Sequence, residues 1–320
     1  MQTSLLSKPL TTSMKGIAIL LVFISHAGND GFRIKFLIPL GAIAVAVFLI
    51  LSGYGLMESY NKNGLCGFWS KRFLRVLFPY LIWIGFYSSL MLLLGKDLSL
   101  EDLRYWFVEY ILIWYVVFYF VMKYTFRYKW FVFLLVATLL FLFMPNLHAQ
   151  QSLSFIVGIT ISEKKDYIAS FGSGKLLTVG CISLILAMIA FGVKHWITIR
   201  SAGMPPVELN DYLVINHIEE NDYWTKLLQL APKVPFAISL IIILMFLHIE
   251  RYNFIFVTGL ASYEIYLVHC PFRGTINNNV GNLILLIIVV SAFTFLLYQL
   301  NKKVSNIAIT ILVKKGRKNE

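Results

Sequence analysis

Charged residues are scarce in this sequence: Asp, Glu, Lys and Arg make up 14% of its 320 residues, whereas hydrophobic residues make up 58%. An average globular domain has about 25% charged and about 45–50% apolar residues. A chain so poor in charge cannot cover the surface of a water-soluble domain, and it is too apolar to be disordered. The composition therefore indicates an all-α, polytopic transmembrane helical bundle in a lipid bilayer. Because apolar segments fill both halves, we expect residues 1–320 to form a single membrane-embedded domain.

Cysteine is scarce too, since only Cys66, Cys181 and Cys270 occur and they form no spaced set. This excludes paired zinc-binding motifs and a disulfide framework, so we expect no metal site. No small-x-small cleavage site follows the first apolar run, so we expect that run to remain as a helix. The sequence also lacks a Pro-rich or Ser-rich linker and an internal repeat.

The net charge is +12, which on a soluble protein would suggest a nucleic-acid partner. Here the basic residues lie between apolar segments, as membrane orientation requires, so we expect no nucleic-acid partner. With the N-terminus placed in the cytoplasm, 19 of the 28 Lys and Arg residues fall inside and nine outside. The positive-inside rule then places both termini in the cytoplasm of a multi-pass protein of the cell (inner or plasma) membrane.

A transmembrane helix needs about 20 mostly apolar residues. By that measure the sequence predicts about ten spans, at 14–30, 37–57, 76–95, 105–123, 129–146, 151–163, 174–194, 233–249, 254–272 and 282–301. The sixth is the shortest. Residues 195–232 are expected as an outer loop, which contains five acidic residues and either caps an outer cavity or is a solvated connector.

Titratable residues inside spans are costly, so each one is a candidate for function. Lys15 and His26 are eleven residues apart in the first span, which is about three helical turns and a rise of about 16 Å. They therefore share a face, with a cation at the cytoplasmic rim and an imidazole in mid-membrane. Histidine suits proton transfer, although the pair also fits an orientation anchor plus an interhelical hydrogen bond.

A basic cluster follows the second span. Arg72 and Arg75 are three residues apart, so on a helix they lie on one face and can bind one polyanion. Pro79, at the start of the next span, suggests a break between an interfacial helix and that span. The alternative for the two arginines is an ordinary positive-inside signal.

The ninth span carries a polar stripe. Ser262, Tyr266 and His269 occur at i, i+4 and i+7, whereas Glu264 points elsewhere. Such a stripe in an apolar helix faces the bundle interior or a water-filled cavity. It is either part of a site or a seam of interhelical hydrogen bonds.

In this order the segments resemble the integral-membrane acyltransferase 3 family, whose members O-acylate surface polysaccharides and related acceptors. The similarity runs along most of the chain and includes a basic residue followed, after ten intervening residues, by a histidine in the first helix, although here Lys15 replaces the commoner Arg. The other segments that carry it are AVAVFLILSGYGL at 44–56, KRFLR at 71–75 followed by Pro79, Trp114-Tyr115, FIVG at 155–158 and SYEIYLVH at 262–269. Lysine cannot make the bidentate contact of a guanidinium, so the role of position 15 stays open.

The resemblance implies transfer of an acyl group, most often acetyl, from cytoplasmic acyl-CoA to a hydroxyl of a cell-surface or lipid-linked glycan. On this interpretation His26 is the catalytic general base, and acyl-CoA is a co-substrate with no other cofactor. Lys15, Arg72, Arg75, Ser262, Tyr266 and His269 bind acyl-CoA or line the site. Direct transfer and an acyl-enzyme relay both remain open.

Other functions also suit ten spans with intramembrane His and Glu residues. One is a transporter or flippase of lipid-linked sugars or another solute, although the sequence shows no inverted repeat or matched pair of broken spans. Another is a receptor-like or scaffold protein without chemistry, against which stands the number of titratable groups in mid-span.

Overall fold

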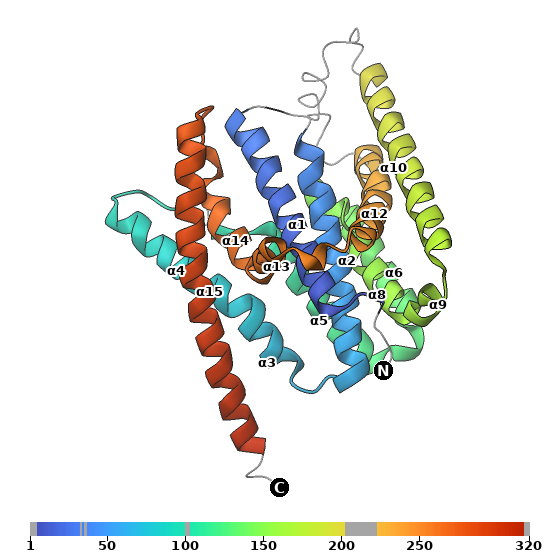
Figure 1. The fold of residues 1–320 in the computed structure, drawn as a ribbon, viewed down its shortest axis with the longest axis horizontal. Coiled ribbons are helices and arrows are strands. Elements are labelled where there is room, and N and C mark those ends of the chain that lie inside the picture. Colours follow the sequence, from blue (N-terminus) through green and yellow to red (C-terminus); the bar gives the residue numbers. More distant parts are fainter. Residues whose placement is uncertain (1–4, 33, 35–36, 100–102, 202–222, 317–320) are drawn as a thin grey trace.

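The computed structural model describes residues 5–32, 34, 37–99, 103–201 and 223–316, and these form a helical bundle with no strand among them (Figure 1). The long helices are α1 (Lys8–His26), α2 (Ile38–Asn63), α4 (Phe78–Leu93), α5 (Trp106–Tyr124), α6 (Lys129–Phe143), α10 (Ser173–Ser201), α12 (Tyr223–Phe246) and α15 (Val280–Gly316). Shorter ones are α3 (Phe68–Arg72), α7 (Asn146–Ala149), α8 (Ser154–Glu163), α9 (Lys165–Ala169), α13 (Asn253–Leu260) and α14 (Ser262–His269). The predicted all-α membrane bundle is confirmed.

Eight helical segments of the described chain are long and apolar enough to cross a membrane. Two of the ten expected spans are not single helices long enough to cross a membrane. The ninth is broken into α13 and α14, which are bent by 64° where the chain leaves helical geometry at Ala261. The sixth is α8, whose 10 residues rise only about 15 Å. The count of ten continuous spans is therefore not confirmed.

The chain nevertheless returns across the bundle through α7 and α8. Lys129 at the start of α6 forms an ion pair with Glu163 at the end of α8, so these two ends lie at the same side. Both marked chain ends also lie toward one side of the bundle (Figure 1). This arrangement fits an even number of crossings, while the assignment of that side to the cytoplasm stays a prediction.

The connection between α10 and α12 is shorter than the expected loop 195–232. Helix α10 continues to Ser201 and α12 begins at Tyr223, so only residues 202–222 remain, and these lie outside the described residues. Three lysines that we counted in the outer segments are consequently helical and buried: Lys194, Lys226 and Lys233 have exposed fractions of 9%, 2% and 5%. Lysine stems that pack along helices let such residues sit deeper than hydropathy suggests.

Glycines allow the helices at the centre of the bundle to approach closely. A Cβ on Gly53 of α2 would lie 2.2 Å from the carbonyl oxygen of Phe155, and one on Gly158 of α8 would lie 2.0 Å from that of Ile50. Small residues at helix crossings are typical of membrane proteins, where close van der Waals packing replaces the hydrophobic effect. Beside this crossing, the rings of Trp114 and Phe155 stack with centroids 5.1 Å apart.

Polar contacts connect the C-terminal end of α2 to the C-terminal end of α8 and to α9. The carboxylate of Glu58 accepts hydrogen bonds from Ser162 at 2.7 Å and from Lys165 at 2.9 Å. The bond to Glu58 raises the pKa of Lys165, which stabilises its charged form. This end therefore presents fixed charges, as expected where a bundle meets water.

Candidate active site

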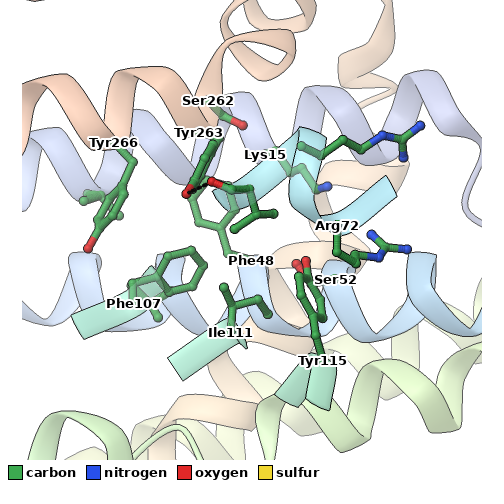
Figure 2. A pocket seen from close by; sticks show the side chains of 14 residues that line it. Lys15, Phe48, Ser52, Arg72, Phe107, Ile111, Tyr115, Ser262, Tyr263 and Tyr266 are labelled. Atoms are coloured by element: carbon green, nitrogen blue, oxygen red, sulfur yellow. Dashed lines mark hydrogen bonds between the residues drawn. The ribbon is translucent and has the colours of Figure 1, made fainter. Parts of the chain in front are cut away.

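A cavity of about 200 Å³ lies among α1, α2, α5, α14 and the turn between α3 and α4 (Figure 2). Five of the seven site residues predicted from the sequence line it: Lys15, Arg72, Arg75, Ser262 and Tyr266. Its other polar lining comes from Ser52, Tyr115 and Tyr263, and the rest of the wall is apolar. Segments far apart in the sequence thus meet at one cavity.

One end of the cavity is basic. Figure 2 shows Lys15 and Arg72 together at that end, with Tyr266 and Phe107 at the other. No acidic residue lines the cavity, and the ion pairs found in the described chain do not involve Lys15, Arg72 or Arg75. Uncompensated cations in an apolar surrounding are costly, so this end is suited to a ligand that carries several negative charges.

Arg72 is held in place largely by aromatic rings. Its guanidinium carbon lies 5.1 Å from the ring centroid of Tyr115 and 5.7 Å from that of Phe68. Its Nε is buried and has no hydrogen-bond partner in the structure. A buried donor without a partner is costly, and an anionic oxygen in the cavity would satisfy it.

The expected break before Pro79 is a wide turn rather than an interruption. Phe73–Leu77 (η3) is a π-helical turn that joins α3 to α4, and Phe68–Leu93 forms one continuous candidate span. Pro79 has no backbone N–H to donate, and a π turn just before it changes which residues face inward. With this turn, Arg72 in α3 and Arg75 in η3 both line the cavity.

A tyrosine hydrogen bond joins η3, the turn that carries Arg75, to α14. Tyr263 donates from its hydroxyl to the carbonyl oxygen of Val76 at 2.9 Å (Figure 2). Further along α14, Tyr105 donates to the carbonyl oxygen of Leu267 at 3.1 Å and accepts from Trp83 Nε1 at 3.0 Å. These bonds fix α14 on both sides, so the cavity has a defined shape.

His26 and His269 form a pair just beyond the apolar end of the cavity. Nδ1 of His26 is 2.9 Å from Nε2 of His269, and the two rings stack with centroids 5.1 Å apart. Val22, one helical turn before His26, and Tyr266, three residues before His269, both line the cavity. The face that Lys15 and His26 share therefore runs from the basic end to the imidazole pair.

Comparison with known families identifies the family of this chain. The acyltransferase domain family, acyltransferase 3, matches residues 12–300, which is nearly the whole chain. The chain belongs to this family. No curated protein and no solved structure matches it. The match supports a multi-pass membrane acyltransferase that works in a lipid bilayer on an acceptor substrate.

Other titratable groups of this acyltransferase lie away from the cavity. Glu264 accepts a hydrogen bond from Asn301 of α15 at 3.0 Å, so it points away from Ser262 and Tyr266 as expected. Both carboxylate oxygens of Glu109 accept hydrogen bonds from the guanidinium of Arg104, each at 2.9 Å. Within the described ranges, no group of three or more His, Cys, Asp or Glu side chains is placed to hold a metal ion.

Sequence reasoning missed three polar residues of the cavity: Ser52, Tyr115 and Tyr263. All three lie inside segments that carry the family resemblance, at 44–56, 114–115 and 262–269. Spacing alone does not single out their hydroxyl groups, because a Ser hydroxyl in a helix commonly bonds a carbonyl of the preceding turn and because tyrosine is frequent in this chain, which has 17. Tyr263 lies three residues before Tyr266, so extending the helical face of Tyr266 back by one turn would have suggested it.

Proposed function

We propose that this membrane acyltransferase moves an acyl group, in the simplest case acetyl, from cytoplasmic acyl-CoA to a hydroxyl of a cell-surface or lipid-linked glycan. His26 acts as the general base. The observation that carries the proposal is one cavity with three basic side chains at one end and an imidazole pair beyond the other.

The basic end suits the phosphate groups of coenzyme A. Two guanidinium groups and an ammonium can bind several phosphate oxygens, and such charge-assisted bonds are stronger than neutral ones. Along α1 the rise from Lys15 to His26 is about 16 Å. An extended pantetheine arm separates the diphosphate of coenzyme A from its thioester by a comparable length, so the thioester would reach the imidazole pair.

The reaction at that point is a balanced exchange. His26 accepts the proton of the acceptor hydroxyl while the hydroxyl oxygen bonds to the thioester carbonyl carbon. The carbon–sulfur bond then breaks, and the thiolate takes the proton back from the imidazolium to give free coenzyme A. General base catalysis of this kind contributes about 10²–10⁴-fold to a rate.

The acceptor would approach from the other end of the bundle. His26 is only half-buried, unlike His269, and the π-helical turn Ala27–Phe32 (η1) follows it directly. Gly31 of that turn accepts a backbone hydrogen bond from Asn278 at 2.9 Å, so the loop before α15 lies beside it. An acceptor hydroxyl entering here would meet the imidazole without crossing the basic end.

Thioester turnover tests the proposal. The full chain, purified in detergent, is given acetyl-CoA with and without candidate glycans, and free thiol is measured. Thiol release that depends on the glycan and is lost in His26→Ala supports acyl transfer, whereas a transporter would release no coenzyme A. O-acetyl content of surface glycans with and without the gene then identifies the acceptor.

A further inference from the structure

His269 is the most deeply buried polar group near the proposed base. Its side chain is 1% exposed, and it lies between His26 and the rings of Phe23 and Tyr266, with centroid distances of 5.8 Å and 5.9 Å. Both of its ring nitrogens have partners: Nε2 is 2.9 Å from Nδ1 of His26, and Nδ1 is 2.8 Å from the carbonyl oxygen of Ile265. The ring is thus fixed at both nitrogens.

These two contacts determine where the protons are. A carbonyl oxygen only accepts hydrogen bonds, so Nδ1 of His269 must carry a hydrogen and donate it to Ile265. In a neutral imidazole the other nitrogen is then an acceptor, so Nε2 of His269 accepts a hydrogen bond. Nδ1 of His26 must therefore carry the hydrogen of the pair.

One consequence concerns the atom that performs the chemistry. With its hydrogen on Nδ1, a neutral His26 has its free electron pair on Nε2. A free imidazole side chain in water favours the opposite form, with the hydrogen on Nε2, and in that form Nε2 cannot accept a proton. The partner of His26 therefore decides whether Nε2 is a base.

We infer that His269 is a positioning residue that holds His26 in the Nδ1–H tautomer, so that Nε2 of His26 is the base of the reaction. This inference rests on the proposed function and specifies its catalytic atom. During the step, Nε2 of His26 takes the hydroxyl proton and later returns it to the thiolate. His269 remains neutral throughout, and its hydrogen bond from Nδ1–H strengthens as His26 becomes positively charged.

Nuclear magnetic resonance on the wild-type protein tests the tautomers directly. The full chain is labelled with ¹⁵N-histidine in lipid nanodiscs, and His26→Gln and His269→Gln variants assign the two residues among the six histidines. We expect both His26 and His269 to carry hydrogen on Nδ1 and an unprotonated Nε2. A wild-type His26 with its hydrogen on Nε2 would overturn the inference even if every variant failed to fold.

Kinetics of His269 variants test the consequence for catalysis. His269→Phe keeps a flat ring but removes the acceptor, so kcat is expected to fall about 100-fold, the lower end of what a general base contributes, with an unchanged KM for acetyl-CoA. His269→Gln places an amide oxygen near the position of Nε2 and is expected to recover part of kcat. His248→Asn, at an exposed histidine with φ of 47°, is the control and should behave as wild type.

The outcomes separate this inference from the proposed function. If His26→Ala keeps its activity, the general-base proposal fails and the role of His269 fails with it. If His26→Ala is inactive but His269→Phe retains a normal kcat, only the positioning role is wrong. A purely structural role for His269 would lower the amount of folded protein but leave the His26 tautomer and kcat per folded molecule unchanged.

Discussion

Gly16 of α1 and Gly259 of α13 lie against each other where these helices cross. A Cβ on Gly16 would be 2.2 Å from the carbonyl oxygen of Ile255, and one on Gly259 would be 1.9 Å from that of Thr12. Real side chains do not approach a backbone so closely, so either substitution must push the two helices apart. Lys15 precedes Gly16, and the crossing therefore also fixes one wall of the proposed donor cavity.

Gly259→Ala should destabilise the protein by about 1–3 kcal/mol, as expected for an overpacked interface. The measurement is the thermal unfolding of the purified protein in detergent. Gly85→Ala is the matched control, because a Cβ at Gly85 meets no atom within 4 Å. Equal melting temperatures for the two variants would show that α1 and α13 do not cross in this way.

His26→Ala should leave a folded, membrane-inserted protein that no longer transfers acyl groups. The residue is half-buried and its ring is hydrogen-bonded to His269, so its removal costs little packing. Transfer activity is measured at matched amounts of folded protein, with His248→Asn as the control histidine. Near-normal transfer by His26→Ala would exclude His26 as the general base.

Arg72→Ala and Arg75→Ala should mainly weaken donor binding. Each is expected to raise KM for acyl-CoA about 10-fold, which corresponds to about 1.4 kcal/mol of lost phosphate contact. The rise should be smaller for a substrate that lacks the 3′-phosphate of coenzyme A. Arg127→Ala, a basic residue of the short helix Phe126–Tyr128 with no place in the cavity, serves as the control. A normal KM with reduced protein abundance would instead identify the arginines as orientation signals.

The helical class and most of the site were predictable because their signals are local. Long apolar runs specify membrane helices, and the spacing of Lys15 and His26 or of Ser262, Tyr266 and His269 specifies helical faces. What a spacing cannot show is which faces meet. The contact between His26 and His269 joins residues 243 positions apart and depends on how α14 is tilted by the bend at Ala261.

Span boundaries were predicted less well for physical reasons that hydropathy does not record. The ninth span contains a bend, and α8 is short because the polar stretch before it, including Gln150 and Gln151, is buried inside the protein. Gln151 donates to the carbonyl oxygen of Ala42 at 2.9 Å, so a segment that resembles a loop is satisfied by the bundle. The buried lysines Lys226 and Lys233 hid the start of α12 in the same way.

The orientation in the membrane is testable, and the donor site depends on it. Gly274 lies in Cys270–Thr275 (η8). This segment contacts η1, which lies beside the first turn of α2. Asn61 lies in the last turn of α2, a helix of 26 residues. The two positions are therefore about the length of α2, some 39 Å, apart along the bundle. If both termini are cytoplasmic, Gly274 is outside and Asn61 inside.

Single cysteines at these positions report the side. In a background in which Cys66, Cys181 and Cys270 are replaced by Ser, Gly274→Cys should react with an impermeant maleimide in intact cells, because the site is exposed and a Cβ there meets no atom within 4 Å. Asn61→Cys, also exposed, should react only after the membrane is opened. The cysteine-free background gives the blank, and labelling in detergent shows that both sites are reactive. Reversed labelling would place Lys15, Arg72 and Arg75 toward the outside, where no free acyl-CoA is present, and would refute acyl-CoA as the donor bound in this cavity.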